Sequence, residues 1–425
     1  MIVILSGIVL LLHSVLIQPV QNDSIQNISR FGVKDAVSIA MKNNPEINQL
    51  ETRIKAEGKS RWSAVGLSSP DLFYFREGIP EGSAHTTSPD FVEQRYGISQ
   101  SLQFPLTSYY QYQKINYNFE SLKKELQAKQ ALLKANVKKY YTNIALAIKL
   151  YQLSTVQVNL AKQIRDAVTT RYQVGETGQI DVLKAEIQLA EANNDLDDAN
   201  KQLHDARYSL FFLIGLDPSR QSYDIEFTDT LRYFEYDLNQ QTILNSIEHQ
   251  PELRSLDDQL KSARSAIRQY RSSYLPDLGV SYYKQDYGNG YDFYGVQVSL
   301  KIPLWFLFNQ NVSTQIAKTR YNEIGWARRS ILLSLKKNVE TTWHSYSNSL
   351  QTIRRYHQKI RSQSENMLQL TLEGYREGEL DLLTLLDTQR TYLNSQRRYY
   401  EALHTYYMRL IEIEKFLHKD IVYNE

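Results

Sequence analysis

The residue types that catalyse reactions or bind metals do not form a recognisable site in this sequence. The eight histidines are scattered, and His344 and His357 lie thirteen residues apart on one expected helix, which favours solvated or hydrogen-bonded side chains over a metal site. There is no Ser, His and Asp arrangement and no phosphate-binding glycine loop. The lack of cysteine excludes a disulfide, a thiolate metal site and a cysteine nucleophile. We therefore expect neither an enzyme nor a protein with a cofactor or bound metal.

Tyrosine, glycine and acidic residues recur instead in a motif that occurs twice. Residues 375–390, YREGELDLLTLLDTQR, align without a gap with residues 172–187, YQVGETGQIDVLKAEI. In this alignment Tyr172 matches Tyr375 and Gly175 matches Gly378. Two weaker pairs, NNPEI with HQPEL and YGISQSLQFP with YGVQVSLKIP, extend the similarity over most of the chain. We infer that the chain is an internal tandem duplication.

Each copy of the motif lies between two long heptad-like runs. Glycine commonly ends a helix, and the Asp, Thr or Glu that follows favours the start of the next one. Each copy is therefore expected to form the tip of a long antiparallel helical hairpin. The outgoing helices are expected at about 108–172 and 311–375, each about 100 Å long, and the returning helices at 181–213 and 382–417. Shorter helices at 31–66 and 241–274 can stack end to end with the returning ones.

A strand pattern precedes each long helix. Residues 96–104 and 294–302 alternate apolar with small or polar residues at the period of a strand, and 72–76 and 278–284 supply a partner strand in each half. Pro105 and Pro303 are expected to end the strands and start the helices, because proline cannot donate to a sheet ladder but fits the first helical turn. Nearby aromatic residues suit an outer-membrane β-barrel, although a soluble sandwich strand can show the same alternation. Four strands cannot close a barrel, so this interpretation requires an oligomer.

These patterns divide the chain into four parts. Residues 1–22 resemble an export signal peptide, with a short membrane anchor as the alternative. Residues 31–215 form the first structural repeat, 216–240 an extended connector, and 241–425 the second repeat. The fold class expected is mainly α with a membrane β-barrel.

The duplicated order of strands and long hairpins resembles the TolC-type outer-membrane efflux protein family. The motifs behind this resemblance are GETGQIDVLKAE and GELDLLTLLDTQR, the two Pro-Glu helix starts, and the two strand-to-helix prolines. It implies a homotrimer whose twelve strands form one barrel in the outer membrane of a Gram-negative-type bacterium, with a helical tunnel in the periplasm. It also implies two partners: a periplasmic adaptor, and an inner-membrane pump of the resistance-nodulation-division or ABC type.

The same resemblance implies a gate at the hairpin tips. By position, Asp181 and Asp387 match the family's acidic constriction residues, and Tyr375 matches a tyrosine whose hydroxyl can reach an acidic partner. Thr384 stands where a second acidic ring often lies, Leu380 stands where a gate arginine can lie, and Asp381 can compensate for the lost charge. Gly175, Gly178 and Gly378 are expected in the turns that face the adaptor. The alternative for Asp181 and Asp387 is a role as helix caps or solvated first-turn residues.

Two functions are compatible with the sequence. The preferred one is a passive export channel; the other is a periplasmic coiled-coil scaffold or envelope tether that does not conduct. The polar residues of the strand pattern favour the channel, since a spacer has no use for a polar lumen. A net charge of +2 gives no indication of a nucleic-acid partner. Drugs, metal cations and polypeptides all remain open as the exported substrate.

Overall fold

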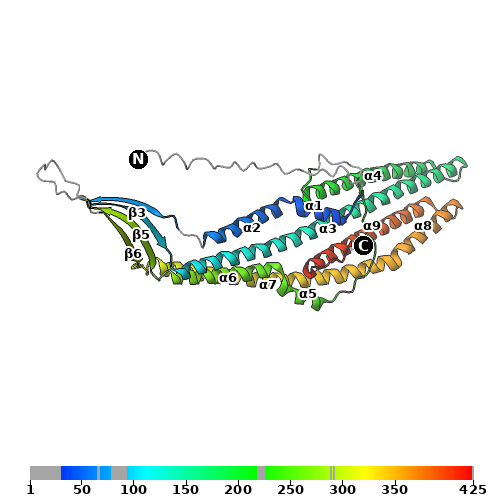
Figure 1. Cartoon of the computed structure of the whole chain (residues 1–425). Coiled ribbons are helices and arrows are strands. Elements are labelled where there is room, and N and C mark those ends of the chain that lie inside the picture. Colours follow the sequence, from blue (N-terminus) through cyan, green and yellow to red (C-terminus); the bar gives the residue numbers. More distant parts are fainter. Residues whose placement is uncertain are drawn as a thin grey trace.

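The protein is an elongated molecule with a sheet at one end and helical hairpins running away from it (Figure 1). The computed structural model describes residues 30–64, 68–77, 93–217, 225–287, 290 and 292–423. The expected signal peptide at 1–22 lies outside the described residues, and so does the expected end of the first short helix near Gly66.

Four antiparallel strands form the sheet. They are β2 (Asp71–Glu77), β3 (Glu93–Leu102), β5 (Asp277–Asp286) and β6 (Asp292–Lys301), in the order β2-β3-β5-β6. The register pairs Ile98 with both Leu72 and Tyr282, and Tyr282 with Val296. The prediction of four strands from two repeats is confirmed, and among the described residues β2 and β6 have no further strand beside them.

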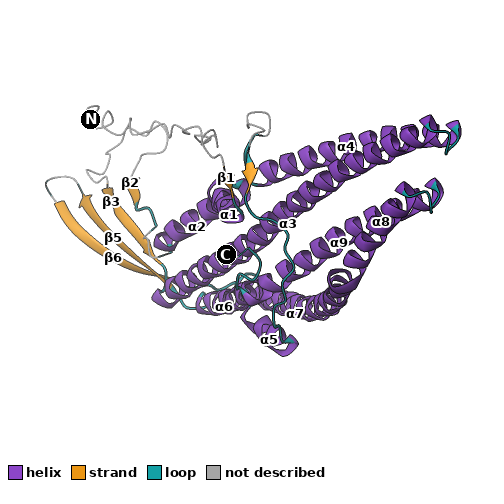
Figure 2. Ribbon diagram, turned by 90° about the vertical axis from the view of Figure 1, so that its right-hand side faces the viewer, coloured by secondary structure: helices purple, strands orange, loops and turns teal. Residues whose placement is uncertain are grey.

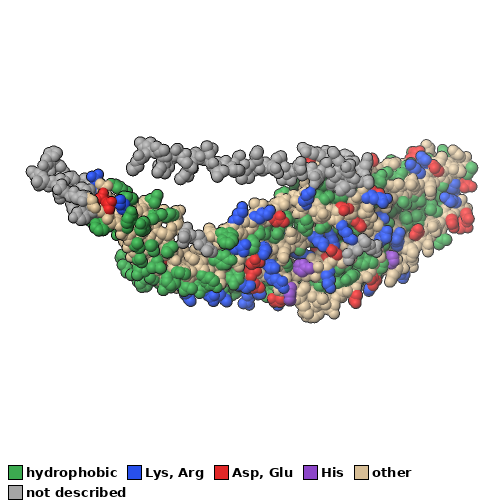
Figure 3. Space-filling view, in the orientation of Figure 1, with side chains coloured by type: hydrophobic (Ala, Val, Ile, Leu, Met, Phe, Trp, Pro, Cys, Tyr) green, Lys and Arg blue, Asp and Glu red, His purple; other side chains and the backbone are tan. Residues whose placement is uncertain are grey.

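The two faces of the sheet differ in chemistry. The register places apolar side chains such as Leu72, Ile98, Val280 and Val298 on one face, where they are exposed. Figure 3 shows this apolar surface at the sheet end of the molecule and charged residues over the helices. The opposite face has serines, glutamines and glycines, together with the aromatic residues Phe73, Tyr283 and Phe293.

One of these glycines leaves room for an aromatic ring. A β-carbon at Gly295 would overlap the Tyr283 ring, whereas one at Gly97 would overlap the Tyr282 carbonyl and, at 2.6 Å, the Tyr283 β-carbon. The Tyr283 ring therefore lies over Gly295, and the Arg95 guanidinium lies over the ring at 4.9 Å from its centroid.

Each repeat contains one long hairpin. In the first, α3 (Pro105–Gln173) has 69 residues and α4 (Gln179–Leu213) returns beside it. In the second, α7 (Gln310–Arg355) and α8 (Arg361–Arg376) run out and α9 (Leu382–Leu417) returns. At 1.5 Å per residue α3 is about 100 Å long, as predicted.

The half-length helices complete each layer. They are α1 (Val33–Asn43) and α2 (Pro45–Ser63) in the first repeat, and α5 (Gln240–Ser246), the 3₁₀ turn Ile247–His249 and α6 (Pro251–Ser272) in the second. Pro45 and Pro251 each open a helix, as expected. In Figure 2, α1 and α2 continue the line of α4 toward the sheet, beside the full-length α3.

The expectation for Pro303 is wrong in one respect. Pro105 is the first residue of α3, but α7 starts seven residues after Pro303, at Gln310. Between them the run LWFLF forms tight turns, in which Phe308 N–H donates to the Trp305 carbonyl at 3.1 Å and Asn311 N–H to the Phe306 carbonyl at 2.9 Å. All five apolar side chains of this run are exposed, from 43% for Phe306 to 76% for Leu304.

The second outgoing helix is also interrupted. Residues Tyr356–Ile360 form one π-helical turn between α7 and α8. The connector packs at this point: Tyr233 stacks on His357 with ring centroids 4.4 Å apart, and Glu235 accepts two hydrogen bonds from Arg354. π-turns commonly interrupt helices at such specific contacts, and heptad spacing alone does not reveal them.

A buried polar cluster joins the two repeats at mid-length. Lys138 of α3 donates to the Glu414 carboxylate of α9 at 2.8 Å, to Asp420 at 2.7 Å and to the Val422 carbonyl at 3.3 Å. The Lys138 and Glu414 side chains are only 4% and 7% exposed. Glu414 also accepts the backbone N–H groups of Ile421 and Val422, which fixes the C-terminal segment against α3.

The connector is anchored beside this cluster. Its short strand β4 (Glu226–Phe227) pairs in parallel with β1 (Arg30–Phe31). The Tyr141 hydroxyl of α3 donates to the Phe31 carbonyl at 2.8 Å and accepts the Asp229 N–H at 3.1 Å. The described part of the connector is otherwise irregular, and it runs across the helices at mid-length in Figure 2.

Candidate gate at the hairpin tips

Both hairpin tips have the same turn geometry. Gly175 and Gly378 have φ angles of +82° and +80°, which glycine adopts without strain. In the first tip Gly175 N–H donates to the Tyr172 carbonyl and Glu176 N–H to the Arg171 carbonyl; in the second, Gly378 and Glu379 repeat this with Tyr375 and Gly374. These are the two hydrogen bonds of a Schellman motif, which ends a helix sharply. Gly178 lies at the N-cap of α4 with an ordinary φ of −90°.

The acidic residues after the turns differ in their surroundings. Asp381 is the N-cap of α9, and its carboxylate accepts the Thr384 N–H at 2.8 Å, which lowers the pKa of Asp381. Asp181 lies in the first turn of α4, accepts a hydrogen bond from the Thr177 hydroxyl at 2.7 Å and has Lys184 at 3.5 Å. Asp387 is exposed and lies in the second turn of α9. Of the two residues for which a cap or first-turn role was the alternative, Asp181 lies in a first turn, whereas Asp387 is exposed one turn farther along its helix. The residue that caps α9 is Asp381.

Tyr375 is buried between the hairpins. It is 2% exposed, whereas its counterpart Tyr172 is 43% exposed. The Tyr375 ring belongs to an apolar cluster with Ile164 and Val168 of α3 and Leu385 of α9. Within the described chain its hydroxyl has no hydrogen-bond partner, and burial, with a smaller contribution from Asp181, raises the pKa of Tyr375. The packing of its ring therefore holds Tyr375 in this structure. Its hydroxyl makes no hydrogen bond to an acidic residue among the described residues.

Sequence reasoning missed Arg171. This arginine, two residues from the end of α3, reaches across to the second hairpin, where its Nη1 donates to the Tyr375 carbonyl at 2.9 Å. Its guanidinium carbon lies 5.0 Å from the centre of the Tyr375 ring, and its Nε lies 3.2 Å from the Glu176 carboxylate of its own turn. A basic residue in the last turn of a helix is a visible signal, but its reach to another hairpin depends on tertiary packing.

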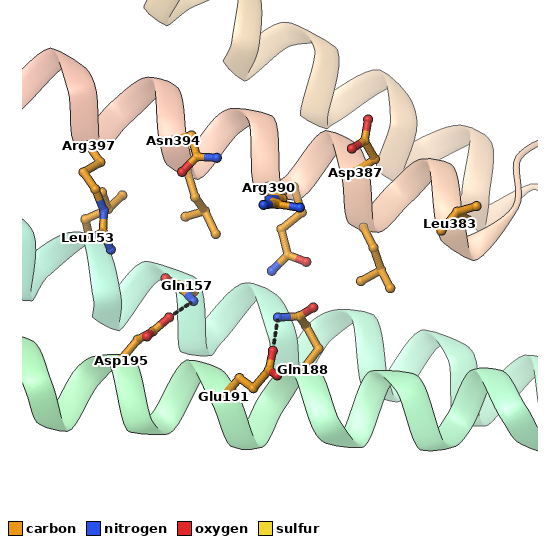
Figure 4. Close-up of a pocket in the computed structure, with 13 residues that line it drawn as sticks. Leu153, Gln157, Gln188, Glu191, Asp195, Leu383, Asp387, Arg390, Asn394 and Arg397 are labelled. Carbon is orange, nitrogen blue, oxygen red and sulfur yellow. Dashed lines mark hydrogen bonds between the residues drawn. The ribbon is translucent and has the colours of Figure 1, made fainter.

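A groove of about 440 Å³ separates the hairpins farther from the tips. In Figure 4, Arg390 and Arg397 project from α9 toward a wall where α4 contributes Glu191 and Asp195. Leu153 of α3 and three leucines of α9 also line the groove. Its lining is Leu153, Gln157, Gln188, Glu191, Asp195, Leu383, Leu386, Asp387, Gln389, Arg390, Leu393, Asn394 and Arg397. Asp387 therefore lines this groove, whereas Asp181 lies near Tyr375.

The fold matches those of solved outer-membrane proteins. The solved outer-membrane channel OprN is similar over 91% of this chain and 89% of its own, with a TM-score of 0.76 and 17% identity. The outer membrane protein VceC of Vibrio cholerae is similar over 91% of this chain and 95% of its own, with a TM-score of 0.75 and 16% identity. At these identities the likeness establishes the fold.

The family follows from the sequence match. The outer membrane efflux protein model matches residues 93–216 and 242–417, and the chain belongs to this family. A curated relative, the pyoverdine export outer membrane protein OpmQ of Pseudomonas putida, is 24% identical over 262 residues. That alignment spans 58% of this chain and 53% of the relative. The expected resemblance is confirmed. Within the described residues, no helix has an apolar stretch long enough to cross a bilayer.

Proposed function

We propose that the chain is one subunit of a trimeric exit duct that spans the outer membrane and reaches into the periplasm. The two-faced sheet supports this proposal most directly, since its exposed apolar face suits lipid and its polar face suits a water-filled lumen. Its edge strands β2 and β6 run antiparallel to each other, so β6 of one copy can pair with β2 of the next and close the ring.

In this proposal the duct is a passive conduit. An inner-membrane pump supplies the energy and a periplasmic adaptor joins it to the hairpin tips, where the turns of Gly175, Gly178 and Gly378 are exposed. The family match supports this arrangement, and the choice of substrate rests with the pump.

The tips would also form the gate. Asp181, Tyr375, Asp381, Thr384 and Asp387 all lie within the last turns before or the first turns after the two tips. Three copies of a carboxylate around a narrow opening attract cations and repel anions, so the closed duct should pass small cations preferentially.

Ion selectivity tests this proposal. In planar bilayers under a salt gradient, we expect the wild-type channel to prefer cations and the Asp181→Asn, Asp387→Asn variant to lose most of that preference. Asp198→Asn, at an exposed position farther along α4, is the matched control and should leave the reversal potential unchanged. If the double variant conducts with unchanged ion selectivity, these two carboxylates do not line the pore. Absence of conductance in the wild type would favour the tether.

A further inference from the structure

We propose that Arg171 is a latch that holds the tip of the second hairpin against the first, so that opening of the gate requires the release of this one side chain. The proposal rests on the duct function proposed above and adds a positioning residue to its gate.

The guanidinium of Arg171, on the first hairpin, contacts two groups of Tyr375 on the second hairpin: its backbone carbonyl and its ring. The Arg171 guanidinium donates to the Tyr375 carbonyl at 2.9 Å and covers the Tyr375 ring at 5.0 Å. That carbonyl also accepts the Gly378 N–H at 3.2 Å, so it belongs to the turn that ends α8. The carbonyl end of a helix has partial negative charge and attracts a cation. Arg171 thus supplies to α8 a C-terminal cation that comes from the other hairpin.

The contact runs in one direction only. In the alignment of the two tips, the position equivalent to Arg171 is Gly374, which has no side chain to send back. A β-carbon at Gly374 would lie 2.9 Å from Leu380 Cδ1, so Leu380 covers this position. The two repeats have therefore diverged at this position: the first tip supplies the arginine and the second tip supplies the carbonyl and ring that it contacts.

Glu176 keeps Arg171 paired when the latch is released. Its carboxylate already lies 3.2 Å from Arg171 Nε while Nη1 binds the Tyr375 carbonyl, and the Glu176 side chain is 59% exposed. When Arg171 leaves the Tyr375 carbonyl and ring, its guanidinium therefore stays charge-paired with Glu176. The apolar cluster that includes Leu368, Leu382 and Leu385 remains in contact with the second tip.

The test measures tip separation directly. The chain has no cysteine, so Val174→Cys and Glu377→Cys place one spin label on each tip, both at exposed positions. Distances are measured by pulsed electron resonance in assemblies diluted with unlabelled chains. We expect a narrow distribution in this labelled parent and a broader, longer one with Arg171→Ala. A charge-assisted hydrogen bond shifts an equilibrium by about tenfold or more, and the open probability in bilayers should rise accordingly.

Two further variants keep the result interpretable. Arg165→Ala removes another α3 arginine, whose described contacts are with the adjacent Asp166, and should leave the distances unchanged. Arg171→Lys keeps the charge without the planar fork and should give an intermediate distribution. Unchanged distances with Arg171→Ala would overturn the latch. A changed distance in an assembly that never conducts would support the latch and contradict the duct function.

Discussion

Replacement of Lys138 by methionine is expected to lower the free energy of unfolding by about 3–5 kcal/mol. The substitution leaves Glu414 buried beside the C-terminal segment with its charge unpaired, and removal of one partner from a buried ion pair is costly for this reason. Loss of helical circular dichroism on heating, in detergent, measures the effect. The C-terminal segment should also become sensitive to proteases, because Glu414 and Lys138 together hold it.

A control and a rescue define this prediction. Lys134→Met breaks an ion pair with Asp420 in which both side chains are about 40% exposed, so it should cost less than about 1 kcal/mol. Adding Glu414→Gln to Lys138→Met removes the unpaired charge and keeps an acceptor for the Ile421 and Val422 N–H groups, so most of the stability should return. Equal effects of Lys138→Met and Lys134→Met would contradict the burial argument.

Introduction of lysine at Val298 is expected to block stable insertion of the sheet. Val298 lies on the exposed apolar face of β6, and a lysine facing lipid near the bilayer centre costs about 2–4 kcal/mol in a transmembrane barrel. Every subunit of the assembly would bear this cost. The measurement is the fraction of chain that folds into liposomes as a protease-resistant oligomer.

The matched control lies one residue away. Gln297→Lys introduces the same side chain on the opposite, polar face of the same strand, where water in the lumen can solvate it. We expect this variant to insert like the wild type, with a shift in ion selectivity toward anions. Equal tolerance of both lysines would show that the apolar face does not contact lipid.

The strands and hairpins could be predicted because their signals are local. Alternation in residues 294–302 fixed which side chains share a face, and the observed pairing of Val280 with Val298 agrees with it. The prediction of tips at Gly175 and Gly378 held because both glycines adopt the positive φ that ends a helix. Repetition of each signal in both halves strengthened the prediction.

Other features depend on contacts between distant segments. Nothing local marks Lys138 as the partner of Glu414, since the two are 276 residues apart. The π-helical turn at Tyr356–Ile360 and the reach of Arg171 to Tyr375 likewise depend on packing between separate elements. At Pro303 a local rule gave the wrong helix start, because a segment of tight turns separates this proline from the first residue of α7.

We propose that three chains form one conducting duct. The mass of the particle extracted from outer membranes, together with single-channel conductance on the same sample, tests this proposal. We expect a particle of three chains with small, cation-selective conductance that rises with Arg171→Ala. A monomer that washes off the membrane without detergent would contradict it and would leave a periplasmic scaffold as the better description.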